Sequence, residues 1–515
     1  MPPAALRTSI PAPAPLAGPR GTGRLGTGGI GPRAVILAAL IAGIVIRLWL
    51  AVVNTEANDP HLPVIAIMAF EHRVPTKGDA WEGFQPKLYH ATVAVVWRAM
   101  PTRDPIVLAR AAQLVSCAAG ILTLLVLLRF LRDRSPPGTW PGAGPAATFA
   151  FAALNPGLLG ISAQATNDAF VVLFASLTLL FGVRYFATWR RGDFVAMALA
   201  AVAAGISKGN GLVVGMAVLA TFAIVAARPP RAAGAPRRTA VLAHGGLFLV
   251  TVVPAIAFVG PYASLYRTFG SPFVTNWHLS PAPHLYRETL TERPGLTSIA
   301  HGLLTFRLAN LVRYPTSTWN PSEYPRHRTS LWSRVYAQAH SYRFEAWPPS
   351  WASPSRTVRN LTRLLFLLGI VPVAIMGCGV RETIRARERS PATVLLALTV
   401  LGYLAFVALY SIRLRDYSSM KLIFILPALL GFSVLFSAGT ERVMRMGKVP
   451  RRVATVGLGL LLAGYLVDAG MLIRDLRRHL PSARPPSLDA RAGMSALDRP
   501  AQPAMPGETP CSPRV

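Results

Sequence analysis

The run AVILAALIAGIVIRLWLAVV, residues 34–53, is the first of a series of long apolar stretches in this chain of 515 residues. Its length matches the ~20 apolar residues that an α-helix needs to cross a bilayer. The run is too long and uniform for the core of a signal peptide, and no small-residue cleavage site follows it. We therefore interpret it as a retained span and expect a membrane protein.

Composition supports this interpretation. The chain is 52% hydrophobic and 15% charged, whereas soluble domains carry about 25% charged residues. The formal net charge is +31, from 53 Lys and Arg against 22 Asp and Glu. Nucleic-acid binding does not explain this excess, because most of the basic residues form short clusters between apolar runs, as in cytoplasmic loops. The 3 cysteines lack the spacing of a zinc site or a disulfide framework.

The pattern predicts an all-α polytopic membrane protein with about eleven transmembrane helices, and no alternating strand pattern competes with it. The predicted spans are 34–53, 105–128, 145–163, 168–188, 194–207, 211–227, 239–260, 361–378, 391–412, 420–437 and 453–473. The run 194–207 is the shortest of them. Apart from Arg47, Arg110 and residues at their edges, we expect these runs to be nearly free of charge.

Charge counts orient the chain. Six segments fall on one side if every run spans, and they hold 23 Lys and Arg against 5 Asp and Glu. The segments are 1–33, 129–144, 184–193, 228–238, 379–390 and 438–452. The positive-inside rule places this side in the cytoplasm. We expect a plasma (inner) membrane protein in which 1–33 and 475–515 are disordered tails of a domain at 34–474, with extracytoplasmic loops at 54–104 and 262–360.

The first of these loops contains NDPHLPVIAIMAFEHRVPTKGDAWEGFQPKLYH, residues 58–90. Acids, imidazoles and aromatic side chains are dense here, immediately after a span. Asp59 lies about one turn past the span, where shielding from water would raise its pKa and let it act as a general base. The alternative is that Asn58 and Asp59 cap a short interfacial helix over 62–70.

Glu82 precedes a proline that would start a helix well. Lys87 and His90 would follow on that helix, three residues apart on one face, which could point at an anionic group. A solvated or headgroup-facing turn is the alternative. His61, Gln85 and Tyr89 complete the candidate substrate-binding residues of this loop.

Two further candidates lie at the outer ends of helices. Asp168 begins an apolar run, and an acid in that place is a functional candidate unless it is an N-cap. Lys208 stands in GISKGNG, between two apolar runs, where its ammonium could meet a phosphate. A snorkelling lysine in a tight turn is the alternative.

Three cations, Arg413, Arg415 and Lys421, lie in the short outer connection SIRLRDYSSMKLIFILP. They oppose the positive-inside bias, and a bound phosphate would explain them; pairing of one of them with Asp416 is the alternative. The loop 262–360 holds 5 of the 10 Trp and eleven Arg, side chains suited to sugar faces and to phosphate. HExxH, GxSxG, P-loop and CxxC motifs are absent from the sequence.

Taken in order, these motifs resemble the membrane-embedded GT-C glycosyltransferases, in particular the protein O-mannosyltransferase and aminoarabinose transferase branch. The resemblance covers about 34–440. It rests on Asp59 with Pro75, Glu82, Gln85, Pro86, Leu88 and Tyr89, on Asn155-Pro156 with Asn167-Asp168, on Ser207-Lys208, and on Lys421 with Pro427. Many members carry adjacent acids in the first loop, whereas this chain has Asn58-Asp59 with Glu56 nearby.

The resemblance implies a GT-C-type bundle that transfers a sugar from a polyprenyl-phosphate donor to a lipid, glycan or protein acceptor at the outer face, with inversion at the anomeric carbon. Asp59 would be the base, with Glu82 and Asp168 as further catalytic candidates. Lys208, Arg415 and Lys421 would hold the lipid phosphate. A divalent metal is possible but not indicated, and no metal-ligating residue is assigned.

Two other classes of function remain open. A transporter or flippase of a lipid-linked saccharide would show charges inside its helices and an inverted repeat, neither of which the sequence reveals. A non-enzymatic assembly scaffold would tolerate the loss of Asp59, Glu82 and Asp168 together.

Overall fold

The computed structural model consists of α-helices and short 3-10 helices, with no strand among the residues that it describes. Those residues are 31–54, 61–76, 79–80, 82–228, 238–274, 299–315, 330–344, 351, 355–386, 390–414 and 420–479. The all-α prediction is therefore confirmed for this part of the chain.

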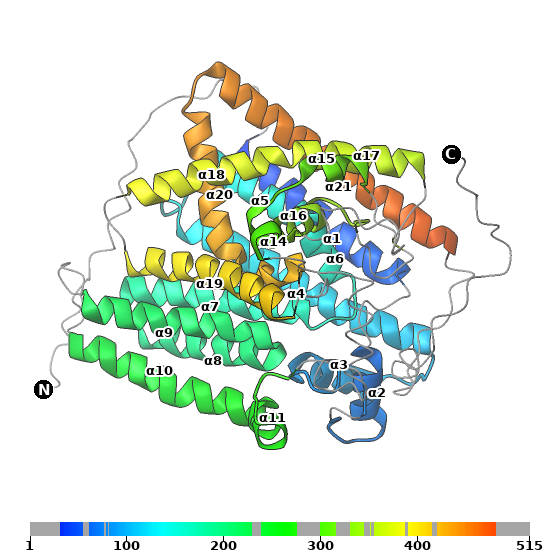
Figure 1. Ribbon diagram of the computed structural model, residues 1–515, viewed down its shortest axis with the longest axis vertical. Coiled ribbons are helices and arrows are strands. Elements are labelled where there is room, and N and C mark those ends of the chain that lie inside the picture. The colour runs from blue at the N-terminus through cyan, green and yellow to red at the C-terminus, as the bar shows by residue number, and fades with distance from the viewer. Residues whose placement is uncertain are drawn as a thin grey trace, which may run out of the picture.

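Most of the long helices run side by side across the molecule, and the short helices α2 and α3 lie toward the right-hand side of Figure 1. In the first half the elements are α1 (Pro32–Val53), α2 (His61–Phe70), α3 (Leu88–Ala99), α4 (Pro105–Asp133), α5 (Ala143–Leu154), α6 (Pro156–Ser162), α7 (Asp168–Thr188), α8 (Arg191–Ser207), η1 (Gly209–Gly211) and α9 (Leu212–Ala227). In the second half they are α10 (Arg238–Val259), α11 (Tyr262–Phe269), α14 (Ile299–Leu304), α15 (Leu308–Arg313), α16 (Leu331–His340), α17 (Arg356–Leu368), α18 (Ile370–Arg385), α19 (Pro391–Leu414), η6 (Leu422–Phe424), η7 (Leu426–Ala428), α20 (Leu429–Met444) and α21 (Lys448–His479).

All eleven predicted apolar runs contain helix. Among the described residues, 8 helices are long and apolar enough to cross a membrane, with α17 and α18 taken together, and the bent pair α5–α6 makes up to 9. The two other runs form α8, of 17 residues, and α20, of 16 residues. Both are shorter than the ~20 residues that a straight span requires, so the count of eleven spans remains a prediction.

The bend of 48° between α5 and α6 has a local cause. Pro156 has no N–H to donate backward, and Asn155 accepts hydrogen bonds from the amides of Gly157 at 3.0 Å and Leu158 at 3.3 Å, which caps α6. The carbonyl of Ala153 would normally accept from Gly157. Arg47 of α1 instead donates to it through Nη1 at 2.8 Å. The chain therefore turns here without leaving that carbonyl unpaired.

Contacts at the two ends of the bundle agree with the predicted alternation of the helices. At one end, Arg184 Nη2 lies 2.6 Å from Asp133 Oδ2, which joins two segments predicted to be cytoplasmic. At the other end, Asn54 donates to the carbonyl of Ala163 at 3.2 Å, which joins the start of the first outer loop to the predicted outer end of the span 145–163. We call this second end, which also carries Asp168 and Lys208, the site end.

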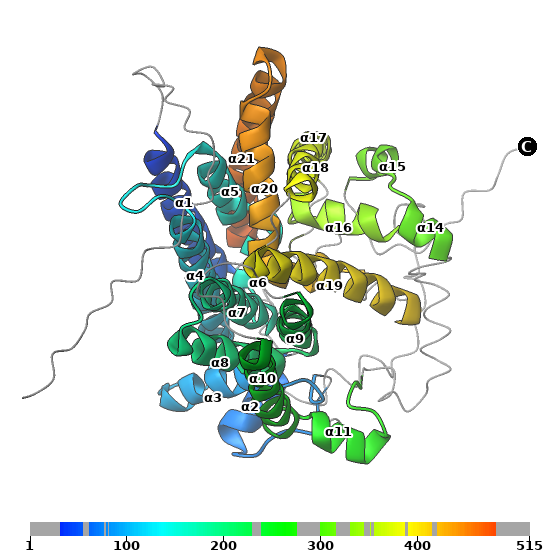
Figure 2. The ribbon, with the colours of Figure 1, turned by 90° about the vertical axis from the view of Figure 1, so that its left-hand side faces the viewer.

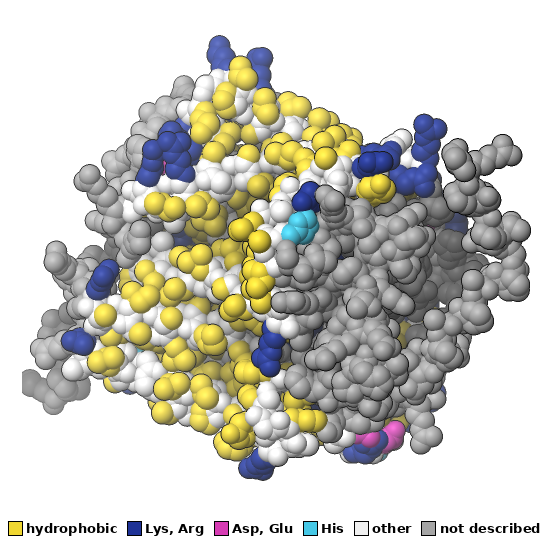
Figure 3. Space-filling model, viewed as in Figure 1, with side chains coloured by type: hydrophobic (Ala, Val, Ile, Leu, Met, Phe, Trp, Pro, Cys, Tyr) yellow, Lys and Arg dark blue, Asp and Glu magenta, His cyan; other side chains and the backbone are white. Residues whose placement is uncertain are grey.

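The core forms around α7, in which 14 of the 21 residues are buried. In the view along the bundle, α7 lies among α4, α8, α9 and α19 (Figure 2). The outer helices turn large apolar side chains outward instead: Val250 and Phe258 of α10 are 64% and 73% exposed. Figure 3 shows this hydrophobic surface extending over α9, α10 and α19, with Lys and Arg at its edges. A surface of this kind fits contact with lipid.

The expectation that the runs are nearly free of internal charge is wrong for the last of them. Asp468, inside α21, is 0% exposed, and its Oδ1 lies 3.3 Å from Nε of Arg343. Arg343 Nη2 also lies 3.0 Å from Oδ2 of Asp475. A buried carboxylate is strongly unfavourable unless it is paired, so the segment after α16 supplies the cation that lets α21 carry this acid.

Candidate active site at the site end

Residues of the first loop meet the start of α7 and the end of α8. Glu82 is 4% exposed, and its carboxylate accepts a hydrogen bond from the side-chain amide of Gln85. Asn167 Nδ2 in turn donates to Gln85 Oε1 and, at 3.2 Å, to the carbonyl of Ser207. Three segments that are far apart in the sequence are thereby joined by side-chain amides.

The ion pair of Asp168 and Lys208 is adjacent to this chain of hydrogen bonds. Lys208 Nζ lies 2.7 Å from Asp168 Oδ1, while Thr166 Oγ1 donates to Asp168 Oδ2 at 3.0 Å. Asp168 occupies the first turn of α7, where the helix dipole favours a negative charge. Its side chain is 1% exposed and that of Lys208 is 13% exposed. The lysine is therefore the partner that solvent or a ligand can reach.

The structure bears on both alternatives, an N-cap role for Asp168 and a tight turn for Lys208. Asp168 is not the N-cap of α7; Asn167 occupies that position, and its side chain makes no cap hydrogen bond. Lys208 does stand at a turn, as the C-cap of α8, but its ammonium is paired with a buried acid. That ammonium also lies 5.7 Å from the ring centroid of Phe424, in η6.

His61 and His90 form a buried pair in which Nδ1 of one lies 3.0 Å from Nε2 of the other. Burial lowers the pKa of His90 well below its ordinary value of 6.5, and the nearby His61 and Lys87 lower it further. His90 is therefore neutral near pH 7, and one ring of the pair donates to the other. The hydroxyl of Tyr89 points elsewhere, donating to the carbonyl of Ala112 at 3.1 Å.

Lys87 does not share the helix of His90, contrary to the prediction. α3 begins at Leu88, and Lys87 is its N-cap residue. Its ammonium turns back into the loop and donates to the carbonyls of Gly83 and Gln85, both at 2.6 Å. Burial lowers the pKa of Lys87 to about 8, although Glu82 and Asp79 act in the opposite direction.

Apart from Tyr89, whose hydroxyl bonds to Ala112 instead, the predicted site residues fall into three groups. Seven of them, together with Asn167, come from the first loop and from the facing ends of α7 and α8: His61, Glu82, Gln85, Lys87, His90, Asp168 and Lys208. Arg413 is exposed in the last turn of α19, and Lys421 is half-buried just before η6. Asp59 and Arg415 lie outside the described residues, so their roles remain predictions.

Asn167 is the main residue that the prediction of the site missed. It was part of the Asn155-Pro156 and Asn167-Asp168 segment, but no role was given to it. The signal was its place beside an acid at the start of a span. Among the described residues, no group of three or more His, Cys, Asp or Glu is arranged to hold a metal ion.

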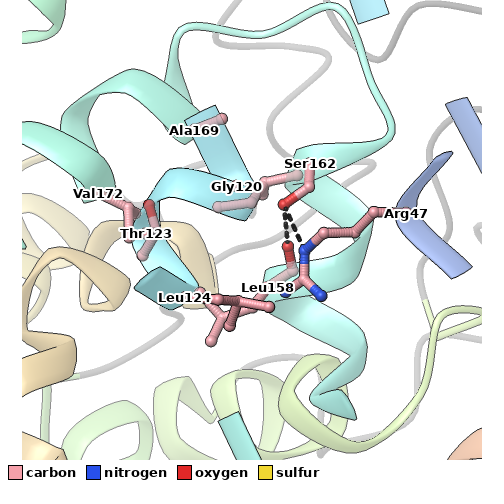
Figure 4. Close-up of a pocket in the computed structure, with 9 residues that line it drawn as sticks. Arg47, Gly120, Thr123, Leu124, Leu158, Ser162, Ala169 and Val172 are labelled. Carbon is pink, nitrogen blue, oxygen red and sulfur yellow. Dashed lines mark hydrogen bonds between the residues drawn. The ribbon is translucent and has the colours of Figure 1, made fainter. Parts of the chain in front are cut away.

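A small pocket lies inside the bundle, between α1, α4, α6 and α7 (Figure 4). Arg47 reaches into it and donates from Nε to Ser162 Oγ at 3.3 Å. Gly120 lies so close to Ser162 that an added Cβ would be 2.1 Å from that oxygen. Ala169, which follows Asp168, also lines the pocket. The packing around Arg47 therefore supports the segment that leads to the ion pair.

Fold and site together define a class: an all-helical protein with several candidate membrane spans and a buried, charged cluster at one end of its bundle. No family model matches the sequence, and no curated protein is similar to it. Among solved structures, the chain is similar to ArnT from Cupriavidus metallidurans bound to undecaprenyl phosphate, with 16% identity over 90% of this chain and 77% of that chain and a TM-score of 0.44. It is also similar to the apo state of that protein, with 15% identity over 78% and 76% of the two chains and a TM-score of 0.33.

Proposed function

We propose that this protein transfers a sugar from a polyprenyl-phosphate donor to an acceptor at the outer face of the membrane, with inversion at the anomeric carbon. The observation that carries the proposal is the ion pair of Lys208 and Asp168, held among first-loop residues at the end of apolar helices. A lipid-borne phosphate needs a cation at the level where a span ends. A buried acid keeps this cation in place before the donor arrives.

In the proposed reaction, a lone pair of the acceptor oxygen or nitrogen forms the new bond to the anomeric carbon. The bond between that carbon and the phosphate oxygen breaks, and its electron pair leaves with the polyprenyl phosphate. The acceptor's proton passes to a carboxylate, for which Asp59 is our candidate, two residues before His61 in the sequence. Because the leaving group departs as an anion, fixed cations can stabilise it without a general acid.

The described residues fit distinct parts of this scheme. Lys208 can turn its ammonium toward a phosphate while Asp168 remains buried. Lys87 is a second candidate for the phosphate, since its ammonium lies in the same loop as Glu82. Glu82, Gln85 and Asn167 fix the loop against α7 and α8. His90, which is neutral and lies 3.0 Å from His61, offers a hydrogen bond suited to a sugar hydroxyl.

The test uses the full chain in vesicles with a panel of sugars on undecaprenyl phosphate, the lipid bound to ArnT in the solved structure. Release of free undecaprenyl phosphate and labelling of an acceptor extract are both measured. We expect Asp59→Ala and Lys208→Met to abolish release. Lys448→Met, an exposed lysine at the opposite end, is the matched control and should leave it unchanged. Normal release by well-folded Asp59→Ala would refute the proposed base.

Transport of a lipid-linked saccharide is the second candidate, because Asp468 and Arg47 are both buried within candidate spans. Intramembrane charges are typical of transport pathways. The same vesicles separate the two functions, since a flippase moves the donor to the other leaflet without consuming it.

A further inference from the structure

Arginines gather on α17 and on the neighbouring α15. Arg356, Arg359 and Arg363 lie on one face of α17 because they are three, four and seven residues apart. Arg313 ends α15, and Arg363 Nε donates to the carbonyl of Val312, one residue before it, at 3.0 Å. We call Arg313, Arg356, Arg359 and Arg363 the arginine patch. Figure 3 shows Lys and Arg side chains gathered at the upper right, where Figure 1 labels α15 and α17.

Three of the four arginines of this patch, Arg313, Arg356 and Arg363, have no carboxylate partner among the described residues. Arg363 donates to two neutral acceptors, the carbonyl of Val312 and, at 2.8 Å, Oδ1 of Asn360. Arg313 lies 5.4 Å from the ring centroid of Tyr314. Three guanidinium groups are therefore available to an anion.

The patch borders a surface suited to acyl chains. Residues Arg356–Arg385 form one candidate membrane span, and the arginines occupy its first two turns. Leu367 follows Arg363 by four residues on the same face and is 49% exposed, and Ile370 is 45% exposed. A stripe of exposed apolar side chains therefore begins where the cations end, which matches the order of headgroup and chains in a lipid.

Membrane topology does not account for these cations. The charge count places the Lys and Arg clusters that orient the chain at the opposite end, and it places the start of α17 outside. Guanidinium groups bind phosphate through paired hydrogen bonds, which an ammonium cannot match.

We propose that the arginine patch binds the phosphate headgroup of an anionic membrane lipid, whose acyl chains lie along Leu364, Leu367 and Ile370. This binding is independent of sugar transfer, because the patch shares no residue with the candidate active site.

The experiment places one fluorophore on Leu367→Cys in a full-length chain whose other cysteines are changed to alanine, reconstituted in phosphatidylcholine nanodiscs. A small fraction of either phosphatidylglycerol or phosphatidylcholine with brominated acyl chains then quenches it. We expect the brominated phosphatidylglycerol to be enriched about fivefold at this position, as attraction of an anionic lipid by a few basic residues predicts. The same fluorophore on Leu401→Cys of α19 should be quenched equally by both lipids.

The triple change Arg313→Gln, Arg356→Gln and Arg363→Gln should remove the enrichment, and the corresponding changes to Lys should keep part of it. If the triple variant does not fold, Arg356→Gln alone, at an exposed position, must reduce it. Two results would overturn the proposal: equal quenching by both lipids at Leu367→Cys, or enrichment that survives the loss of the arginines.

Discussion

Lys208 Nζ lies 2.7 Å from Asp168 Oδ1, so that an ion pair joins the end of α8 to the first turn of α7. The two residues are 40 positions apart in the sequence. Both side chains are largely removed from solvent, and such pairs respond asymmetrically to mutation. Removing one partner leaves an uncompensated buried charge, whereas removing both does not.

Because of this asymmetry, single and double variants of the pair can distinguish a role of Lys208 in stability from a role in donor binding. We expect Lys208→Met to destabilise the protein by about 3–5 kcal/mol and to abolish donor binding. Adding Asp168→Asn should restore most of the stability, because the buried charge is gone, but it should not restore binding. Thermal unfolding and donor affinity of both single variants and the double variant complete the cycle. Recovery of donor binding in the double variant would show that Lys208 has a structural role alone.

The lowered pKa of Lys87 predicts that donor binding depends on pH. Its pKa of about 8 means that the ammonium loses its proton as pH rises through that value. If Lys87 contacts the donor phosphate, affinity should fall between about pH 7 and 9, by about tenfold for each pH unit above the pKa. Lys87→Arg should hold the affinity constant over this range, since arginine stays protonated.

Isothermal titration of the donor at several pH values measures this effect, and a flat profile in the unmodified protein would exclude Lys87 from phosphate binding.

The effect of Lys87 on stability changes with pH in the opposite direction. The unfolded chain binds more protons than the folded chain between about pH 8 and 10.5, because the pKa of Lys87 is lowered by folding. Burial of Lys87 therefore opposes folding fully below about pH 8, and this cost declines as pH rises toward 10.5.

Close packing beside Arg47 gives a third prediction. A Cβ on Gly120 would lie 2.1 Å from Oγ and 2.6 Å from Cβ of Ser162. Gly120→Ala should therefore destabilise the protein by about 1–3 kcal/mol, the usual effect of overpacking. Ser162→Gly should rescue much of the loss in the double variant. Gly215→Ala, inside α9 with no atom within 4 Å of its added Cβ, is the matched control and should be neutral or slightly stabilising.

Melting temperatures of the four variants measure this packing. A Gly120→Ala protein as stable as the original would mean that α4 and α6 separate more easily than their contacts suggest. Loss of donor affinity in a folded Gly120→Ala variant would show that packing near Arg47 positions Asp168.

The pattern of apolar residues predicted the positions of the long helices, because each such helix appears in the sequence as a continuous apolar run. It placed Asp168 and Lys208 at the same end of the bundle, but not in contact, since that depends on the side-chain geometry of two helix ends. The pattern also missed the hydrogen bond between Gln85 and Asn167. Nothing in the spacing of polar residues indicates that two of them, 82 positions apart, are in contact. The prediction for Lys87 was wrong because α3 starts two residues later than Pro86 suggested, and the Lys87 ammonium turns back into the loop.

The last prediction concerns Asp468, whose partner Arg343 lies after the end of α16, where the sequence pattern predicts no helix. Arg343 is 0% exposed, lies 3.3 Å from Asp468, and donates at 3.4 Å to the carbonyl of Trp351. Trp351 Nε1 donates in turn to Asn54 at the end of α1. Asp468→Ala leaves Arg343 paired with Asp475 at 3.0 Å, so it should destabilise the protein by less than the about 3–5 kcal/mol of a fully broken buried pair. Arg343→Met should rescue part of that in the double variant, because Asp475 keeps Arg474 at 3.5 Å. Thermal unfolding measures the rescue, and vesicle assays of the rescued protein separate the two candidate functions. Sugar transfer should persist without these charges, because neither belongs to the proposed active site, whereas a pathway that uses Asp468 to move a saccharide should be lost.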